Sequence, residues 1–336
     1  MRSTTFGQLL SEFFIEHLAG QMNMSQNTIR SYRDTFVLLL RYCRDTMKKP
    51  LERLALDDFS AALAKGFLEH LENERCCGAS TRNQRLAAIH SFARYVQAEE
   101  PQYFLECQRI LLLPLKRHER KEVVYLPPDD LAVLLAQPDL NSSGGRRDAV
   151  LLSLLYDTGA RVQELIDLKV KDIRLDSPAQ VKLTGKGRKV RNVPLMAQTV
   201  KVLQQYLLEN NLAGPDAGEK PVFRNRCGNA LSRSGIRYLL LKYVEKATDA
   251  GAFVHSHVTP HTLRHTKAMH LLQAGNPLVV IRNILGHSEV KTTEIYARAD
   301  MNMKRQALER VAGLTPTPNM PSWQTNRDLM DWLRNL

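Results

Sequence analysis

Apolar residues recur every three or four positions through the first 115 residues of the chain. This spacing places them on one face of a helix, and the faces of successive helices can pack against one another. Helices are predicted to begin near Thr5, at Ser25 or Asn27, near Phe59 and after Ser80. Thr5 and Gln8 also match a capping box, which is a helix start signal. The pattern predicts a helical domain over residues 1–115.

A short charged stretch, residues 116–125, is the predicted linker to a second domain over residues 126–314. Short strands interrupt the helical pattern of this domain. The predicted strands are Val170–Leu175, Val181–Thr184 and Lys189–Pro194, with a glycine-rich hairpin turn at 185–188. The predicted helices are Pro128–Ala136, Arg146–Asp157, Ala160–Leu168, Ala197–Glu209, Leu231–Ala247, one from Thr259, Pro277–Leu285, Val290–Arg298 and Asn302–Ala312. The sequence therefore predicts a mainly α fold with a small β-sheet.

Residues 315–336 are predicted to form a C-terminal tail. The first part of the tail, residues 315–324, is rich in proline and polar residues, which mark an irregular segment. An amphipathic helix is predicted over Asp328–Leu336, with Leu329, Trp332 and Leu333 among its apolar residues. Three states are open for this helix: docked on a neighbouring copy of the protein, packed on its own domain, or frayed.

The chain is strongly basic, with a formal net charge of +12 and an isoelectric point near 9.5. This charge favours a polyanionic partner, with nucleic acid ahead of a membrane surface. A content of 43% hydrophobic and 24% charged residues excludes wholesale disorder. No apolar run is long enough to span a bilayer and no signal-peptide pattern is found, so a cytoplasmic location is expected. The five cysteines lack C-x-x-C spacing and are expected to be reduced thiols.

The stretch 259–298 carries the strongest signal for chemistry. Thr259 is a good helix N-cap and Pro260 suits the first helical position, so His261 and Arg264 lie in the first turns of a helix. Free N–H groups and the positive end of the helix dipole favour an anion there. Gly286 ends the next helix, His287 follows in the turn, and Tyr296 lies beyond it. The order predicts a phosphate site to which a tyrosine hydroxyl is brought.

Each candidate site residue, in this stretch or earlier in the chain, also has a simpler interpretation when it is taken alone. Arg161 and Glu164 have the spacing of a surface ion pair, and Lys186 between two glycines is typical of an exposed turn. Tyr296 alone would be a packed helix aromatic. His261 and His265 have the i, i+4 spacing of a zinc protease, but Thr262 stands where that motif requires glutamate. Arg264 would also repel a cation, so we expect no metal.

The motifs resemble, in order and spacing, those of the tyrosine recombinases, or phage-integrase family. They are Arg161-x-x-Glu164, Gly185-Lys186-Gly187, His261-x-x-Arg264-His265, Leu285-Gly286-His287-Ser288 and Tyr296. The helical N-terminal part resembles the SAM-like core-binding domain of the family, less specifically. No arm-binding domain is recognised ahead of it. The chain is therefore similar to short Xer-like and transposon-encoded members, including integrases of mobile-element recombinase clusters.

This resemblance implies a role for each matching residue. Tyr296 would attack the scissile phosphate to form a 3′-phosphotyrosyl link. Arg161, Arg264 and His261 would hold the nonbridging oxygens, and His287 would donate a further hydrogen bond. Lys186 would protonate the leaving 5′-oxygen. Glu164 and His265 would orient these groups, and neither a cofactor nor a metal would be required.

The resemblance further implies a site-specific recombinase of the integrase or transposase type. Its two domains would close as a C-shaped clamp on duplex DNA, and four copies would assemble on two DNA sites. Sister recombinases or accessory DNA-bending proteins are further possible partners. The residues expected to contact the DNA are Arg82, Gln84, Arg85, Arg117 and Arg188. For those of the helix and of the linker, a merely solvated surface is the alternative interpretation.

Two other functions share part of this sequence signal. A type IB topoisomerase would use the same chemistry but rejoin the original strand, which relaxes supercoils without exchange between sites. A DNA-binding or architectural protein would show salt-dependent binding and no covalent adduct. The presence of Tyr296, Arg161 and Arg264 together argues against the second of these, because binding alone does not require them.

Overall fold

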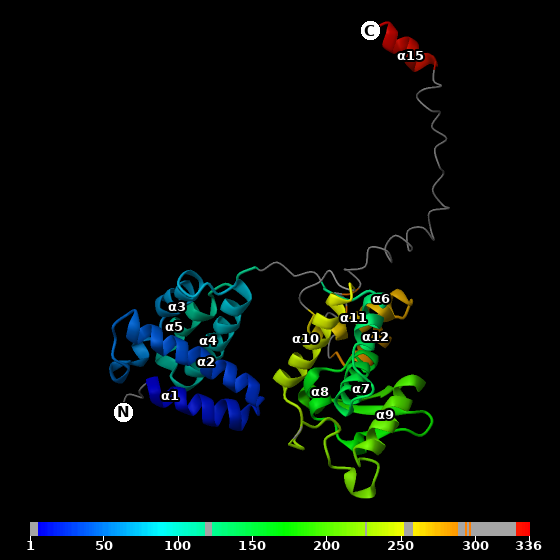
Figure 1. Cartoon of the computed structure of the whole chain (residues 1–336). Coiled ribbons are helices and arrows are strands. Elements are labelled where there is room, and N and C mark those ends of the chain that lie inside the picture. The colour runs from blue at the N-terminus through cyan, green and yellow to red at the C-terminus, as the bar shows by residue number, and fades with distance from the viewer. Residues whose placement is uncertain are drawn as a thin grey trace. The chain divides into compact units, whose positions relative to one another are not determined.

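The chain divides into two compact units, Met1–Lys121 and Glu122–Leu336, in this computed structural model (Figure 1). The structure describes residues 6–117, 123–225, 227–251, 258–287, 293, 296 and 327–336. The division between the units falls inside the charged stretch 116–125. Within the described residues, no helix combines the length and apolar character that crossing a membrane requires.

The first unit is a helical bundle with an aromatic core. Its helices are α1 (Phe6–Glu12), a π-helix (Phe13–Gln21), α2 (Gln26–Asp45), α3 (Ala61–Asn73), α4 (Ala79–Glu99) and α5 (Phe104–Leu111). Ser25 and Ser60 cap α2 and α3 by accepting hydrogen bonds from main-chain N–H groups. Phe92 packs against Phe13 and Phe36, each at 5.2 Å between ring centroids. The helical prediction is confirmed, although the capping residue Thr5 lies outside the described residues.

The second unit surrounds the buried helix α7. Its helices are α6 (Pro128–Ala136), α7 (Ser143–Thr158), α8 (Val162–Ile166), α9 (Ala197–Glu209), α10 (Arg233–Asp249), α11 (Pro260–Gln273), α12 (Leu278–Leu285) and α15 (Arg327–Arg334). Four leucines of α7 are fully buried, which makes this helix the centre of the core. They are Leu151, Leu152, Leu154 and Leu155. Of the predicted helix Val290–Arg298, only Thr293 and Tyr296 are described, and the predicted helix Asn302–Ala312 lies outside the described residues.

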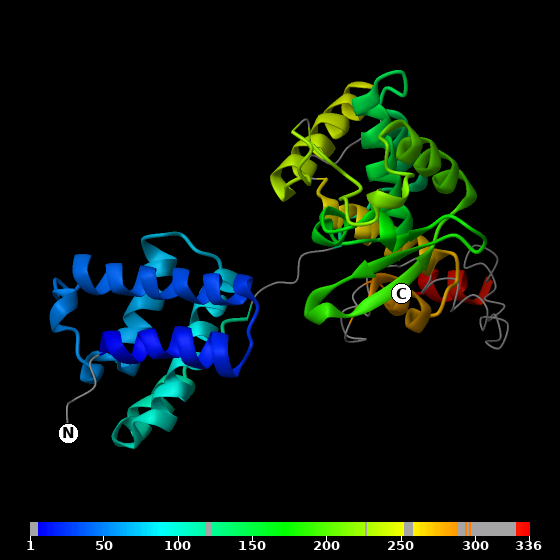
Figure 2. The ribbon, with the colours of Figure 1, turned by 90° about the horizontal axis from the view of Figure 1, so that it is seen from below.

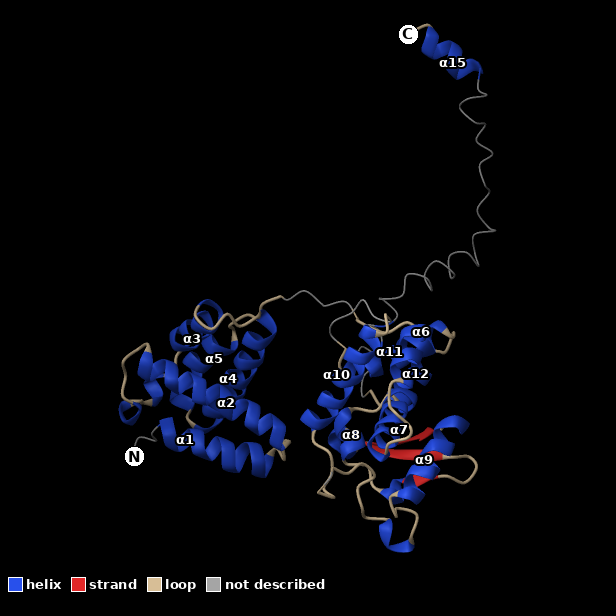
Figure 3. Ribbon diagram, viewed as in Figure 1, coloured by secondary structure: helices blue, strands red, loops and turns tan. Residues whose placement is uncertain are grey.

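A three-stranded antiparallel sheet lies at one side of this unit (Figures 2 and 3). Its strands are β1 (Ile173–Arg174), β2 (Gln180–Thr184) and β3 (Val190–Pro194). Val181 pairs with Val193 and Thr184 with Val190, so the turn 185–188 closes a hairpin. The predicted mainly α fold with a small sheet is confirmed.

Two predicted elements are shorter than expected. The strand predicted over Val170–Leu175 is reduced to β1, because Val170 and Lys171 donate their main-chain N–H groups to the carbonyls of Lys220 and Gly218 instead. The helix predicted over Ala160–Leu168 begins only at Val162. Arg161 is extended, and its N–H donates to the Glu164 carboxylate.

Gly159 ends α7 in the left-handed conformation, with φ at +57°. A Cβ at this position would lie 2.5 Å from Leu285 Cδ2. The carbonyl of Gly159 accepts a hydrogen bond from Arg264 Nη1 at 2.6 Å. The glycine therefore lets α7 end against α12 while its carbonyl faces α11.

We predict that Gly159→Ala lowers the free energy of unfolding by about 1–3 kcal/mol, since an L-residue pays for the left-handed conformation and also meets Leu285. Gly144→Ala is the matched control. Gly144 lies in the first turn of the same helix, and a Cβ there meets no atom within 4 Å. It should be neutral or stabilising by up to about 1 kcal/mol. Urea denaturation followed by circular dichroism measures both, and equal midpoints for the two variants would contradict the prediction.

Candidate active site

The first two turns of α11 supply three of the predicted site residues. Thr259 Oγ1 accepts a hydrogen bond from the N–H of Thr262, and Thr262 Oγ1 accepts one from the N–H of Thr259. This reciprocal cap fixes where the helix begins. His261 and His265 consequently lie one turn apart on the same side, with their ring centroids 6.5 Å apart, and Arg264 is in the same turn.

Arg264 is buried, with 3% of its surface exposed. Its guanidinium donates to the carbonyl of Gly159 at 2.6 Å and to that of Leu285 at 2.7 Å. These carbonyls are at the C-terminal ends of α7 and α12, where the helix dipole is negative. Burial, together with the charge of Arg161, lowers the pKa of Arg264 to about 10, so the side chain stays charged at neutral pH.

The Glu164 carboxylate joins two further guanidinium groups. Glu164 Oε1 accepts from Arg161 Nη1 at 2.9 Å. Arg191 binds both carboxylate oxygens, at 3.0 and 2.7 Å. Burial by itself raises the pKa of Glu164, but the hydrogen bonds from Arg191 and Arg161 outweigh it and lower the pKa to about 2. The interpretation of Arg161 and Glu164 as a surface pair is therefore wrong, since Glu164 is only 4% exposed.

Arg191 is a site residue that the sequence did not reveal. It lies in β3, opposite Leu183, and its Nε donates to the carbonyl of Ile284 at 2.8 Å. Gly286 makes room for it: a Cβ on Gly286 would lie 2.8 Å from Arg191 Nη1. The glycine is therefore required for close approach as well as for its positive φ of +67°. No sequence motif around Arg191 indicated a role in the site, because its partners, Glu164 and Ile284, belong to other elements.

Tyr296 is packed beside the histidines. Its hydroxyl oxygen lies 2.8 Å from His265 Nδ1, and its ring is stacked on that of His287 at 6.4 Å between centroids. His287 Nδ1 in turn lies 2.9 Å from Thr293 Oγ1, a contact that the sequence analysis missed. Burial raises the pKa of Tyr296, while Arg264 and Arg161 act to lower it. The structure thus brings Tyr296 together with the predicted residues of α11.

The surroundings of the three histidines of the site favour their neutral form at pH 7. Burial and the neighbouring guanidinium groups lower the pKa of His287 to about 4. Burial is also the main cause that lowers the pKa of His261 and of His265. A neutral imidazole has one nitrogen that donates and one that accepts. Each of these rings can therefore donate one hydrogen bond and accept another.

A cleft of about 660 Å³ opens next to these groups. Positively charged side chains and glycine backbone border it, and they come from α8, the β2–β3 hairpin and α12. The residues that border it include Arg161, Gly185, Gly187, Lys189, Arg191 and His287. The backbone of Lys186 lies between two of these glycines, in the hairpin turn. Such a cleft suits an anion bound through its oxygens.

The five residues expected to contact DNA differ in their exposure and in their hydrogen bonds. Arg82 is only 7% exposed and donates to the carbonyl of Pro114 at 2.7 Å. Arg85 donates to the Ser31 carbonyl, and the exposed Gln84 donates to the Ser31 hydroxyl, so both tie α4 to α2. Arg117 and Arg188 are exposed. The burial of Arg82 favours a structural role for this residue instead of a phosphate contact.

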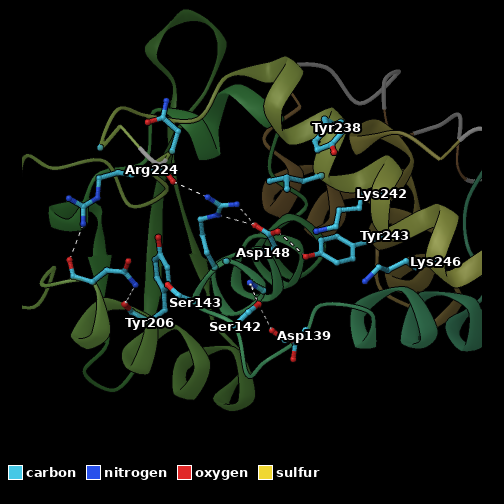
Figure 4. A pocket seen from close by; sticks show the side chains of 17 residues that line it. Asp139, Ser142, Ser143, Asp148, Tyr206, Arg224, Tyr238, Lys242, Tyr243 and Lys246 are labelled. Carbon is cyan, nitrogen blue, oxygen red and sulfur yellow. Dashed lines mark hydrogen bonds and ion pairs between the residues drawn. The ribbon is translucent and has the colours of Figure 1, made fainter.

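A larger cavity, of about 940 Å³, lies at the other end of α7 (Figure 4). Its buried Asp148 is already paired, with Arg147 at 2.7 Å and with the Tyr243 hydroxyl at 2.8 Å. Lys242 and Lys246 border the cavity from α10. A helix rises about 1.5 Å per residue, so the length of α7 separates this cavity from Gly159 by roughly 20 Å. It is therefore separate from the site around Tyr296.

Comparison with known proteins gives a consistent result. The family model described as "Phage integrase family" matches residues 125–303, and "Phage integrase, N-terminal SAM-like domain" matches residues 12–100. An integrase/recombinase of Sinorhizobium fredii, y4rC, is 38% identical over 313 residues, which cover 93% of each chain. A tyrosine recombinase XerC of Pelotomaculum thermopropionicum is 31% identical over 288 residues, covering 84% of this chain and 91% of the relative.

Two solved structures share the fold. The XerH site-specific recombinase bound to palindromic difH substrate has a TM-score of 0.67 at 21% identity, covering 90% of this chain and 84% of that one. The Tn1549 transposon integrase in complex with transposon right end DNA has a TM-score of 0.68 at 19% identity, covering 92% and 99%. At these identities the likeness concerns the fold.

We predict that Glu164→Gln destabilises the protein at pH 7 by about 3–5 kcal/mol, because Arg161 and Arg191 lose a buried counter-charge. The difference in the free energy of unfolding between the two proteins should decrease at acidic pH. The pKa of Glu164 is about 2 in the folded protein, against 4.5 for an unperturbed glutamate side chain. As pH falls between these values the unfolded chain binds the proton first, so this part of the wild-type stability disappears. Urea denaturation at pH 7 and near pH 3 should show the two proteins converging.

Glu219→Gln is the matched control for that comparison. Glu219 lies between Lys169 and Lys171 and its pKa is also lowered, to about 2, by their hydrogen bonds. It is exposed, so solvent screens these charges and its replacement should have a small effect at either pH. A wild-type pH slope that persists unchanged in Glu164→Gln would refute the prediction.

Proposed function

Since this chain belongs to the phage integrase family of tyrosine recombinases, we propose that it breaks and rejoins DNA with Tyr296 as the nucleophile. The observation that carries the assignment is the position of one hydroxyl. Tyr296 Oη lies 2.8 Å from the neutral His265, and Arg264 and Arg161 favour its ionised form. A phenol with a pKa near 10 requires both a proton acceptor and positive charge to attack at neutral pH.

The proposed reaction combines these positions with the roles that the family resemblance implies. Tyr296 Oη bonds to the phosphorus and passes its proton to His265 Nδ1, while the bond from phosphorus to the 5′-oxygen breaks. Arg161, Arg264 and His261 stabilise the charge on the nonbridging oxygens, and such donors are each worth roughly 10²–10³ in rate. Lys186 gives a proton to the leaving 5′-oxygen, and His287 donates to the phosphate. Glu164 orients the guanidinium groups without contacting the DNA.

The covalent link stores the energy of the phosphodiester, so rejoining needs no nucleotide. A free 5′-hydroxyl attacks the phosphorus of the 3′-phosphotyrosyl link and gives its proton to Lys186. The bond from phosphorus to Tyr296 Oη breaks, and His265 returns the proton to Tyr296. Attack by the 5′-hydroxyl of a second site exchanges strands. We therefore propose conservative site-specific recombination, with strand exchange between two DNA sites.

The proposed partner is duplex DNA. The net charge of +12 and the basic cleft support it, as do the solved structures of XerH and Tn1549 integrase, which are bound to DNA. Gln84, Arg85, Arg117 and Arg188 are the proposed backbone contacts. A cytoplasmic location and the division into residues 1–115, 116–125, 126–314 and 315–336 belong to the same proposal.

Assembly is the remaining part of the proposal. Exchange between two sites needs four copies of the nucleophile, so we propose a tetramer, with sister recombinases or DNA-bending proteins as further partners. The C-terminal helix, predicted over Asp328–Leu336, is present as α15. Trp332 and Leu333 are 61% and 52% exposed on it, which is consistent with docking on a neighbouring copy.

The nucleophile is tested by trapping it on DNA. Wild-type protein is incubated with nicked duplexes taken from the DNA that flanks its gene and run on a denaturing gel. An adduct is expected with wild type and not with Tyr296→Phe. Tyr243→Phe is the control, because this buried tyrosine binds Asp148 at the remote cavity and should leave the adduct intact.

The trapping experiment also separates the other functions. An adduct together with relaxation of supercoils, and without exchange between sites, would support a topoisomerase. Tight binding to every flanking duplex with no adduct would contradict the proposed function and support a binding protein.

The role of Lys186 as the acid leads to a second test. Lys186→Ala should slow cleavage of normal DNA by about 10²–10⁴-fold. A substrate with sulfur at the bridging 5′ position should restore the rate, because a thiol, with a pKa of about 8.5, leaves without a proton. Lys189→Ala, which removes a lysine that lines the cleft, is the control and should show no such sulfur-dependent rescue. Equal defects of Lys186→Ala on both substrates would exclude the acid role.

A further inference from the structure

A polar stripe on α11 binds the chain segment that enters the second unit. We call Val123–Pro127 the entry segment. The N–H of Leu126 donates to Thr266 Oγ1 at 3.0 Å, and the carbonyl of Leu126 lies 2.9 Å from His270 Nε2. Gln273 Nε2 donates to the Tyr125 hydroxyl at 3.2 Å. The three α11 residues are spaced four and three positions apart, so they line one face of the helix.

His270 also reaches a third element. Its Nδ1 lies 2.9 Å from the hydroxyl of Tyr156 in α7. The Leu126 carbonyl can only accept, so Nε2 carries the hydrogen, and Nδ1 accepts from the Tyr156 hydroxyl. Burial lowers the pKa of His270, which keeps this neutral tautomer at pH 7. One imidazole therefore joins α7, α11 and the entry segment.

The same two elements, α11 and the entry segment, form part of the wall around Tyr296. The Tyr296 ring belongs to a small apolar cluster with residues of α11 and α12, against which Val123 and Tyr125 pack. The buried members are Ala268, Met269, Leu272, Ile281, Leu285 and Tyr296. His265, which contacts the Tyr296 hydroxyl, lies on α11 as well. A displacement of the entry segment or a rotation of α11 would therefore move both Tyr296 and its partner.

We propose that His270 is a positioning residue for DNA cleavage. By bridging Tyr156 to Leu126 it fixes α11 and the entry segment, and through them the place of the Tyr296 hydroxyl. This inference rests on the proposed function, because it assigns His270 a part in the same reaction. His270 contacts neither the cleft nor Tyr296 in the described structure, so its loss should change the rate of cleavage and leave the affinity for DNA unaltered.

The test compares three variants and one control variant of the full chain at saturating nicked duplex. His270→Ala should slow formation of the covalent adduct by about 10–100-fold, the effect expected of a displacement near 1 Å at the reacting atoms. His270→Gln should recover most of the rate, since an amide can donate to Leu126 and accept from Tyr156. Tyr156→Phe removes one of the two hydrogen bonds of His270, and its rate of adduct formation should lie between those of His270→Ala and His270→Gln. The dissociation constant for DNA should stay within about twofold of wild type in each case.

The matched control is His90→Ala. His90 Nε2 makes the same kind of bond, to the carbonyl of Ile110 at 3.0 Å, but in the first unit. Burial lowers its pKa too. All variants are assayed at a temperature where circular dichroism shows them folded. A rate loss in His90→Ala equal to that in His270→Ala would overturn the inference, because the effect would then be one of general stability.

A second readout does not depend on activity. Fluorotyrosine is incorporated throughout, and the ¹⁹F resonance of Tyr296 is assigned by its absence from Tyr296→Phe. In free protein this resonance should shift or broaden in His270→Ala, return in His270→Gln and stay unchanged in His90→Ala. An unchanged Tyr296 resonance in His270→Ala would overturn the inference. If wild type forms no adduct at all, the proposed function fails, and the resonance still decides whether His270 positions Tyr296.

Discussion

The site depends on one buried carboxylate. Arg161, Arg191 and Arg264 are gathered around a partly buried cleft, where like charges repel far more strongly than in water. Glu164 binds the first two of these guanidinium groups and stays ionised because of them. The third, Arg264, donates instead to the main-chain carbonyls of Gly159 and Leu285. Among the residues that the structure describes, these three guanidinium groups face one carboxylate, which leaves two positive charges without a counter-ion. In the proposed reaction the phosphate of the substrate supplies the balancing negative charge.

Helix ends make this arrangement tolerable in the absence of an anion. α7 ends at Gly159 and α12 at Gly286, both in the left-handed conformation, and the carbonyls at these ends point at the guanidinium groups. Arg191 takes the carbonyl of Ile284 in the same way. The partial negative charge at a helix C-terminus offsets about half an elementary charge. By ending the helices, the two glycines also leave the carbonyls of Gly159 and Leu285 free to accept hydrogen bonds from Arg264.

Sequence patterns predicted the features that depend on neighbouring residues and missed the contacts between residues distant in the chain. The cap at Thr259 and the left-handed Gly286 depend on neighbouring residues alone, and the structure has both as expected. Arg191 could not be recognised, since its importance comes from Glu164 and Ile284, which are distant in the chain. The burial of Arg82 escaped prediction for a related reason: a helical pattern does not reveal that the chain near Pro114 returns to cover one arginine. The strand predicted from Val170 is shorter than predicted, because the main-chain carbonyls of Lys220 and Gly218 accept the hydrogen bonds of its first two N–H groups.

The ionisation of Tyr296 shows how these constraints act together. Burial favours the neutral phenol, and Arg264 and Arg161 favour the phenolate, with burial the larger effect. A phosphate bound in the cleft would offset those guanidinium charges, so it would make a free phenolate still less favourable. In the proposed reaction the proton must therefore leave as the bond to phosphorus forms, and the acceptor has to be in place beforehand. His265 meets that requirement at 2.8 Å in the tautomer with its hydrogen on Nε2, and burial favours its neutral form. Because an acceptor already in place is useful only while α11 is fixed, the orientation of this helix becomes as important to the proposed chemistry as the charges around it.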